Sequence, residues 1–308
     1  MTISMMMEKL SEALEAVVLG VALGDALGNR LEFLQAPTDE DFQRQLGLPL
    51  IVSDDTQMML FSLEAVRQGK SFADGYLRWF STQEVSGIGN GLLSFPEMYD
   101  VQSPGSTCIS ACKSLLAGRR VSNDSKGNGT VMRCAHIAYE AKAAGRTLVQ
   151  AIALATEDAE TTHKHPYAAL SSSLLVAIYW ELINGKCIAD ALATAIGSVN
   201  APPEIAEICL SALKPDRYRR MREEFGGWVA EEALALAVGA VAHNRSFLDV
   251  IRTAVTISGD SDTVGAIAGG LAAGCGMCPP IHLARKINVW NAIQYVLAIK
   301  GEVVQSEA

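Results

Sequence analysis

Basic residues are in deficit in this chain. Its 308 residues include 25 Lys and Arg against 34 Asp and Glu, which gives a formal net charge of −9. Nucleic-acid binding relies on a basic surface that contacts phosphates, so we expect no direct binding of nucleic acid. An anionic ligand of this chain would instead depend on backbone N–H groups, helix N-termini or bound metal ions.

Cysteines are few and follow no disulfide pattern. The chain has seven, an odd number, dispersed through segments of helical periodicity. A secreted disulfide framework is therefore not expected, and we interpret the cysteines as reduced core residues of a cytoplasmic protein. The amino-terminal segment agrees with this interpretation, because it lacks the basic region and the cleavage site of a secretory signal peptide.

Long apolar runs are also scarce. The one extended stretch without a formal charge spans residues 263–284, and five of the seven residues at 265–271 are Gly or Ala. Such a stretch is too weakly apolar, and with Pro279 and Pro280 too broken, to cross a bilayer. It predicts a tightly packed core helix instead, so we expect no membrane association.

Alternating strand patterns are nearly absent, with residues 48–52 the only short candidate. Helical periodicity covers most of the rest, interrupted by Gly, Pro and Asn-Gly breakers. The predicted helices span residues 8–21, 55–68, 72–82, 107–117, 130–143, 148–158, 166–183, 188–199, 204–213, 228–243, 247–257, 262–275 and 281–297. They predict an all-α fold, a single compact orthogonal bundle of about a dozen helices that forms one domain over residues 1–308.

Two of the predicted helices begin with paired acids. Residues 53–55 (Ser-Asp-Asp) precede one apolar run, and residues 260–263 (Asp-Ser-Asp-Thr) precede another. Taken alone, each motif is better explained as a helix cap, which needs one Asp. A second adjacent carboxylate is disfavoured unless a cation lies between the two. Together the motifs supply hard oxygen ligands, which suit Mg²⁺ or Mn²⁺ rather than zinc.

Glycine-rich loops precede two other predicted helices. Residues 125–130 (Ser-Lys-Gly-Asn-Gly-Thr) and residues 103–107 (Ser-Pro-Gly-Ser-Thr) can each present several backbone N–H groups to a phosphate. A simple turn is the alternative, since Asn-Gly is a strong turn dipeptide. His163 lies at the junction of two helices, where a lone histidine is usually structural or solvated.

Seven segments of the chain occur in a specific order. They are GVALGDALGNRLEF (20–33), SDDTQM (53–58), PGSTCISACKSLLAGR (104–119), NDSKGNGTVMR (123–133), THKHPYA (162–168), GWVAEEALALAV (227–238) and SGDSDTVGAIAGGLAAG (258–274). This series closely resembles the ADP-ribosylglycohydrolase family, from about residue 16 to about residue 285. The two acidic motifs with GNG-x-x-MR between them would be hard to produce by chance.

The resemblance implies a two-metal site at helix N-termini in a central cleft. Its cofactors would be two divalent cations, Mg²⁺ or Mn²⁺. The implied catalytic residues are Asp55 and Glu32, the latter on a mobile flap after the GDALG segment. The implied metal ligands are Ser53, Asp54, Asp55, Asp260, Asp262 and Thr263.

The resemblance also implies which residues surround ADP-ribose. They are Gly105, Ser106, Ser125, Gly127, Asn128, Gly129 and His163. Three positions depart from the family pattern: Ser53 stands where many members have Thr, Ser258 where many have Gly, and His136 where many have Pro. Ser53 keeps the hydroxyl, so the departures affect the substrate pocket rather than the metal site.

The function implied is that of a metal-dependent hydrolase. It would cleave the glycosidic bond between ADP-ribose and an acceptor, and release ADP-ribose. The acceptor can be a protein side chain, a nucleobase or a small molecule, so an ADP-ribosylated protein is one expected partner, and the chain is expected to act as a monomer.

Two other functions stay open. A two-metal phosphoester hydrolase would use the same four Asp residues. A catalytically silent ADP-ribose-binding or crystallin-like structural member would share the fold, but loss of acidic ligands would mark it, and here all four are present.

Overall fold

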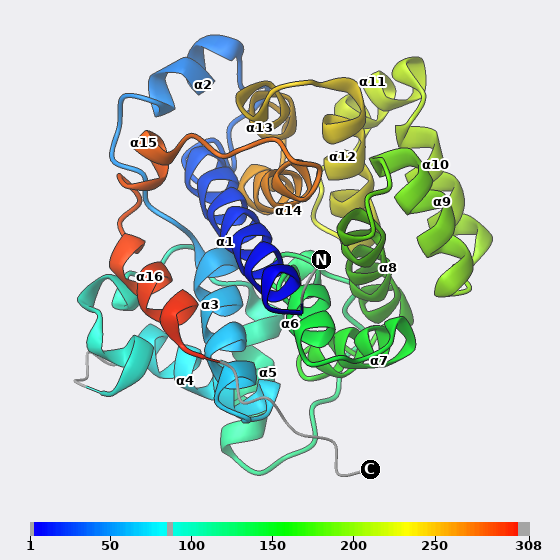
Figure 1. Ribbon diagram of the computed structural model, residues 1–308. Helices are drawn as coiled ribbons and strands as arrows, with labels where there is room; N and C mark the ends of the chain where they lie inside the picture. Colours follow the sequence, from blue (N-terminus) through cyan, green and yellow to red (C-terminus); the bar gives the residue numbers. More distant parts are fainter. Residues whose placement is uncertain (1–2, 85–88, 301–308) are drawn as a thin grey trace.

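A computed structural model of the chain describes residues 3–84 and 89–300 (Figure 1). These residues form sixteen α-helices and three short 3₁₀ helices, and within these ranges there is no extended strand. The all-α prediction is therefore confirmed. The α-helices are α1 (Ile3–Gly28), α2 (Asp39–Gln45), α3 (Asp54–Arg67), α4 (Phe72–Glu84), α5 (Ser106–Leu116), α6 (Ile137–Ala143), α7 (Leu148–Glu160), α8 (Pro166–Ile183), α9 (Ile188–Ser198), α10 (Pro203–Ala212), α11 (Pro215–Glu224), α12 (Ala230–His243), α13 (Phe247–Val255), α14 (Ser261–Gly274), α15 (Ile281–Ala284) and α16 (Trp290–Ala298). The 3₁₀ helices are η1 (Gly91–Ser94), η2 (Pro96–Tyr99) and η3 (Asn128–Thr130).

Helices α1 and α14 pack along each other at the centre of the molecule (Figure 1). Their contact is made by glycines, because a Cβ atom on Gly24 would lie 1.9 Å from the carbonyl oxygen of Gly265. A side chain at either position would force the helices apart. A Cβ atom on Gly28, at the end of α1, would lie 2.4 Å from the carbonyl oxygen of Ser261 in the first turn of α14. The segment that follows α1 is thereby fixed beside the start of α14.

The apolar stretch at residues 263–284 falls mainly on α14, whose residues 261–273 are all buried. The structure thus has the core helix that the sequence predicted there. Among the described residues, a different helix, α8, is long and apolar enough to cross a membrane by length and composition. Since 67% of that window is buried within the protein, α8 too packs as a core helix.

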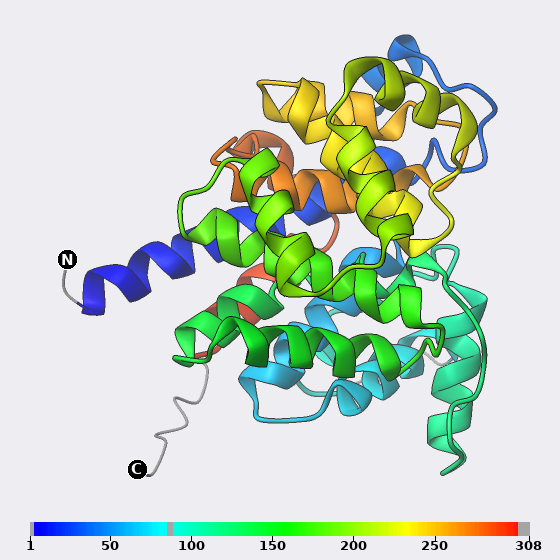
Figure 2. The ribbon, with the colours of Figure 1, turned by 90° about the vertical axis from the view of Figure 1, so that its right-hand side faces the viewer.

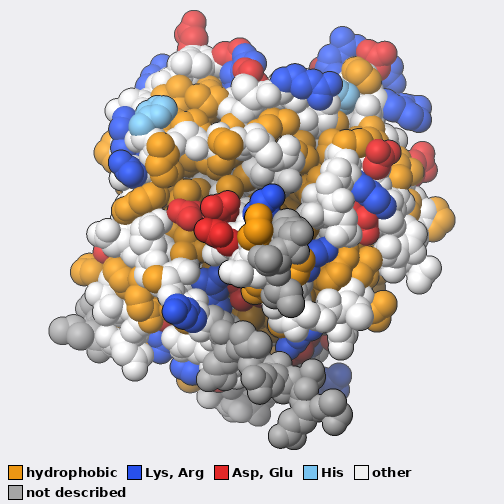
Figure 3. All heavy atoms as spheres, in the orientation of Figure 1, with side chains coloured by type: hydrophobic (Ala, Val, Ile, Leu, Met, Phe, Trp, Pro, Cys, Tyr) orange, Lys and Arg blue, Asp and Glu red, His pale blue; other side chains and the backbone are white. Residues whose placement is uncertain are grey.

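The remaining helices lie on two sides of the α1–α14 pair. Helices α3, α4 and α5 lie on one side, and α10 to α13 lie on the other (Figures 1 and 2). On the face shown in Figure 3, basic side chains gather over α11, where Arg217, Arg219 and Arg220 are exposed. The net negative charge is therefore unevenly distributed over the surface.

Three predicted helices are wrong in their extent, and the first of them, 8–21, is extended to residues 3–28 in α1. The predicted helix 130–143 is replaced by η3, a series of turns, and α6, which begins only at Ile137. Backbone bonds from Asn128 N to the Trp228 oxygen, 3.3 Å, and from Ala230 N to the Lys126 oxygen, 2.9 Å, hold the loop in a paired, extended form. These long-range bonds override the local periodicity.

The predicted helix 281–297 is divided into α15 and α16. Asn288 lies between them, and its backbone N–H donates to the carbonyl oxygen of Leu50. Its side-chain oxygen accepts a bond from Val52 N. The short candidate strand at residues 48–52 is not formed. Its only trace is one isolated bridge between Leu50 and Ile287. Two helices that the sequence did not predict, α2 and α11, lie in polar segments.

Candidate active site

The first turn of α3 carries two acids that do not cap the helix. The cap is Ser53, whose Oγ accepts a bond from Asp55 N at 3.2 Å. Asp54 and Asp55 are nevertheless buried, with 6% and 2% of their surfaces exposed. Asp55 Oδ1 has no hydrogen-bond partner although it is fully buried. Buried carboxylates that serve no capping role require another reason for their presence.

The first turn of α14 combines a cap with a second acid. Asp260 is the N-cap, and its Oδ1 accepts a bond from Thr263 N at 3.3 Å. Its Oδ2 accepts a bond of 2.7 Å from the side-chain amide of Asn128, which fixes the carboxylate from the opposite wall. The capping interpretation therefore holds for Asp260, whereas Asp262 is an additional buried acid.

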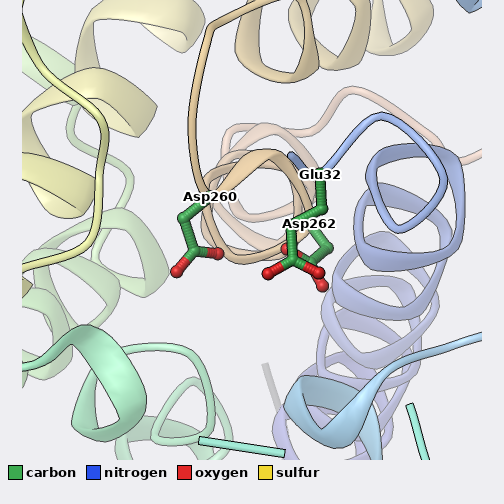
Figure 4. A group of neighbouring side chains, drawn as sticks. All are labelled: Glu32, Asp260 and Asp262. Carbon is green, nitrogen blue, oxygen red and sulfur yellow. The ribbon is translucent and has the colours of Figure 1, made fainter. Parts of the chain in front are cut away.

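Glu32 joins these acids from the segment after α1. One carboxylate oxygen of each of Glu32, Asp260 and Asp262 lies within 4.8 Å of the others, and Figure 4 shows the Glu32 and Asp262 carboxylates together. The backbone N–H of Glu32 donates to the Gly28 oxygen at 3.1 Å. This bond continues the turn that ends α1 and directs Glu32 toward α14.

Two contacts hold the segment around Glu32 against the opposite wall. Phe33 has a backbone φ of 66°, and its ring stacks on Trp228 with centroids 5.7 Å apart. Ala36 N donates a bond of 2.8 Å to Ser258 Oγ. In the sequence, Ser258 is only a departure from the family pattern. In the structure its hydroxyl attaches this segment to the loop before α14.

Asp25 is a site residue that the sequence analysis missed. It is fully buried on α1, and its carboxylate accepts bonds from Ser53 N at 2.8 Å and Thr56 N at 3.1 Å. Thr56 Oγ1 donates a further bond of 2.5 Å. Asp25 thereby orients the turn that carries Asp54 and Asp55. The one feature of the sequence that could have indicated it is an acid within the apolar series GVALGDALG.

The acids surround a cavity of about 290 Å³. Of the fourteen predicted site residues, twelve line this cavity and two, Ser53 and Ser125, lie behind its wall. Ser125 supports the wall, because its Oγ accepts a bond from Gly127 N at 3.3 Å. The described residues that line the cavity and were not predicted are Ser103, Thr107, Cys108, Met132 and Trp228.

The cavity has a strong deficit of positive charge. Five carboxylates line it, and none of the described lining residues is Lys or Arg. Burial, reinforced by neighbouring carboxylates, raises the pKa of Asp54 and of Glu32 to about 8 each. Burial likewise raises the pKa of Asp55 and Asp262 well above the usual range. A divalent cation would reverse this trend by favouring the charged forms.

The donor set fits a hard cation. Five carboxylates offer oxygen ligands to the cavity, the Asp55 Oδ1 atom lacks a partner, and none of the described residues that line the cavity is Lys or Arg. Mg²⁺ and Mn²⁺ prefer such ligands. The arrangement can hold divalent cations between the first turns of α3 and α14, with Glu32 beside them.

The two glycine-rich loops also line the cavity. Gly105 N donates to Asp54 Oδ2 at 3.3 Å, so the loop before α5 contacts the acidic cluster directly. Thr107 and Ser125 join the two loops through their hydroxyls, 3.0 Å apart. The N-terminus of α5 therefore faces the cavity, where it can attract an anion.

Comparisons with known proteins agree with this geometry. A profile of the family described as ADP-ribosylglycohydrolase matches residues 6–276. A solved structure of an "ADP-ribosylglycohydrolase-related protein complex" is similar, with a TM-score of 0.68 and 24% identity over 95% of this chain and 98% of that chain. At this identity the likeness shows the fold alone. A search of curated proteins found no match. On the profile match over most of its length, the chain belongs to the ADP-ribosylglycohydrolase family.

Proposed function

We propose that this chain is a metal-dependent hydrolase that releases ADP-ribose from an ADP-ribosylated acceptor. The observation that carries the proposal is the convergence of four buried carboxylates, the half-buried Glu32 and two glycine-rich loops on one cavity. The carboxylates suit a cation-assisted attack on a sugar, and the loops suit an anionic diphosphate. ADP-ribose has both parts. The free state of all seven cysteines supports the further proposal of a cytoplasmic location.

Two divalent cations, Mg²⁺ or Mn²⁺, would be held by the first turns of α3 and α14. Asp54, Asp55 and Asp262 would be ligands, with Asp260 and Thr263 completing the set. When bound, such ions orient ribose hydroxyls and lower the pKa of a water molecule. Ser53 is assigned a ligand role by the family resemblance, and its cap to Asp55 N also orders the turn that carries the ligands.

The remaining roles belong to groups of the chain itself. The N-terminus of α5 would bind the diphosphate beside the loop at residues 127–129, whose Gly127 and Asn128 N–H groups already donate to Ser125 Oγ and to the Trp228 oxygen. The sequence predicted this role for two helix N-termini, and the one after GNG cannot fill it, because α6 begins only at Ile137. Asn128 would keep the Asp260 carboxylate in place. Glu32 would orient the attacking water or transfer a proton to the leaving group.

Product analysis tests this proposal against the phosphoester hydrolase. The metal-free protein would be given Mg²⁺, Mn²⁺ or Zn²⁺ and a panel of peptides and small molecules that carry ADP-ribose on different linkages. We expect free ADP-ribose with Mg²⁺ or Mn²⁺, little with Zn²⁺, and none in excess EDTA.

Release of inorganic phosphate or AMP instead would favour the phosphoester hydrolase. Full turnover in EDTA, after verified metal removal, would contradict metal dependence. Tight binding of ADP-ribose with no product on any substrate would favour the silent binding protein.

A further inference from the structure

Arg133 is a buried cation close to the cavity but outside its lining. Its side chain is fully buried, and it pairs with Asp158 through Nε and Oδ2 at 3.2 Å. Its guanidinium lies 4.0 Å from the centre of the Tyr76 ring, and the Tyr76 hydroxyl donates a short bond to Asp158. The ion pair is therefore closed off from solvent, and its geometry is set by several contacts at once.

Arg133 has two further contacts on the side of the active site, one of them from Nη1 to the Sγ atom of Cys108 at 3.8 Å. Its Nη2 donates to Thr162 Oγ1 at 2.9 Å, in addition to a bond of 2.8 Å to the Asp158 carbonyl oxygen. A guanidinium only donates, so the Thr162 oxygen is an acceptor in this contact. The hydroxyl proton of Thr162 must then point elsewhere.

That proton has one acceptor within reach in the described part of the chain. His163 Nδ1 lies 2.8 Å from Thr162 Oγ1. Because Thr162 is fully buried and its proton would otherwise lack an acceptor, it donates that proton to Nδ1. A ring nitrogen that accepts a hydrogen bond carries no proton, so a neutral His163 has its proton on Nε2. The Thr162 hydroxyl thus selects one tautomer.

The His163 ring is neutral as well as oriented. Burial, together with the positive charge of Arg133, lowers the pKa of His163 to about 3. A second proton would also place an N–H against the hydroxyl proton of Thr162. His163 therefore enters the cavity as a hydrogen-bond donor rather than as a cation or a base.

The Nε2 edge of the ring faces the glycine loop and the cavity. A Cβ atom on Gly127 would lie 3.3 Å from Nε2, and one on Gly129 would lie 3.1 Å from Cε1. His163 also lines the cavity beside both glycines. The Nε2–H group is thus positioned next to the loop N–H groups, where an oxygen atom of a ligand would accept its bond.

We propose that Thr162 and Arg133 are positioning residues that hold His163 as a neutral Nε2–H donor to an oxygen of bound ADP-ribose. The inference rests on the proposed function for the identity of the ligand. The tautomer of His163 is independent of the proposed function, because it follows from the contacts among Arg133, Thr162 and His163.

Nuclear magnetic resonance on protein with ¹⁵N-labelled histidine tests the tautomer directly. The chain has five histidines. The signals that disappear in the His163→Gln variant are those of His163. We expect the His163 signals of the wild-type protein to show Nε2 protonated and Nδ1 unprotonated at neutral pH. Signals of the Nδ1–H form, or of an imidazolium ring, would overturn the proposal whether or not the protein is a hydrolase.

Two substitutions at Thr162 test the consequence for binding. Thr162→Ser keeps the hydroxyl, and Thr162→Val removes it at nearly equal volume. With Mg²⁺ present, we expect the Val variant to lose the single tautomer and to bind ADP-ribose roughly tenfold more weakly, the effect of about one hydrogen bond. The Ser variant should retain both properties.

A merely structural role for Thr162 would give a different result. It would lower the melting temperature of the Val variant without changing the histidine signals or the affinity of the folded protein. That outcome would overturn the proposal. If the Val variant fails to fold, the tautomer of His163 in the wild-type protein still decides. Absence of ADP-ribose binding by the wild-type protein would reject the ligand and the proposed function, but not the tautomer.

Discussion

Asp55→Asn is expected to abolish turnover while leaving the metal-free protein folded. Asp55 is buried, its Oδ1 atom has no partner, and its pKa is raised well above the usual range by burial. Without metal the uncharged carboxyl is favoured, and Asn is its close mimic. With metal the charged form is needed, so we expect the rate to fall by about 10³-fold or more, which corresponds to several kcal/mol of lost stabilisation.

Thermal unfolding with and without Mg²⁺ separates a ligand from a structural acid. The wild-type melting temperature should rise with Mg²⁺, because the ion binds only the folded state, and the Asn variant should show little rise. Without metal the variant should melt at the wild-type temperature or above it, since one buried acid has been removed.

Asp74→Asn provides the matched control. Asp74 also lies in the first turn of a helix, but it is exposed and accepts bonds from Ser71. We expect this variant to lose up to about 1 kcal/mol with or without Mg²⁺ and to keep its activity. If Asp55→Asn behaved in the same way, the ligand role of Asp55 would be rejected.

Glu32→Gln is expected to lower kcat by roughly 10²–10⁴-fold, the range typical of a lost acid–base group. The side chain is half-buried beside Asp260 and Asp262, and Gln has nearly the same shape but can neither accept nor release the proton. The affinity for ADP-ribose should change little, because the cations and the loops would do most of the binding.

Steady-state kinetics and calorimetry together check this prediction. A fall in kcat with unchanged ADP-ribose affinity supports the assigned role. Glu40→Gln, an exposed acid in the first turn of α2, is the control and should leave both quantities unchanged. Wild-type turnover by Glu32→Gln would show that Glu32 takes no part in the chemistry.

The parts of the site that the sequence predicted well depend on local features. Paired acids at the starts of apolar helices remain at helix starts in the structure, because capping is decided within one turn. Their convergence on one cavity could be expected only from the family resemblance, since nothing local brings residue 54 to residue 260. The all-α class followed from periodicity for the same local reason.

The parts that the sequence missed depend on contacts between distant segments. The predicted helix after GNG fails because Asn128 is bonded to Trp228 and to Asp260, which no local pattern reveals. Asp25 was missed because its partners, Ser53 and Thr56, lie on another helix. In a sequence, such a buried acid is only an exception to an apolar pattern. The pattern does not indicate which groups the acid orients.

Anomalous diffraction from crystals grown with Mn²⁺ and ADP-ribose shows whether the carboxylates at the starts of α3 and α14 bind divalent cations that contact ADP-ribose. We expect two manganese peaks about 3.5–4 Å apart, bound by Asp54, Asp55, Asp260 and Asp262, with the ribose beside them. ADP-ribose bound in the cavity with no manganese among these carboxylates would contradict this expectation.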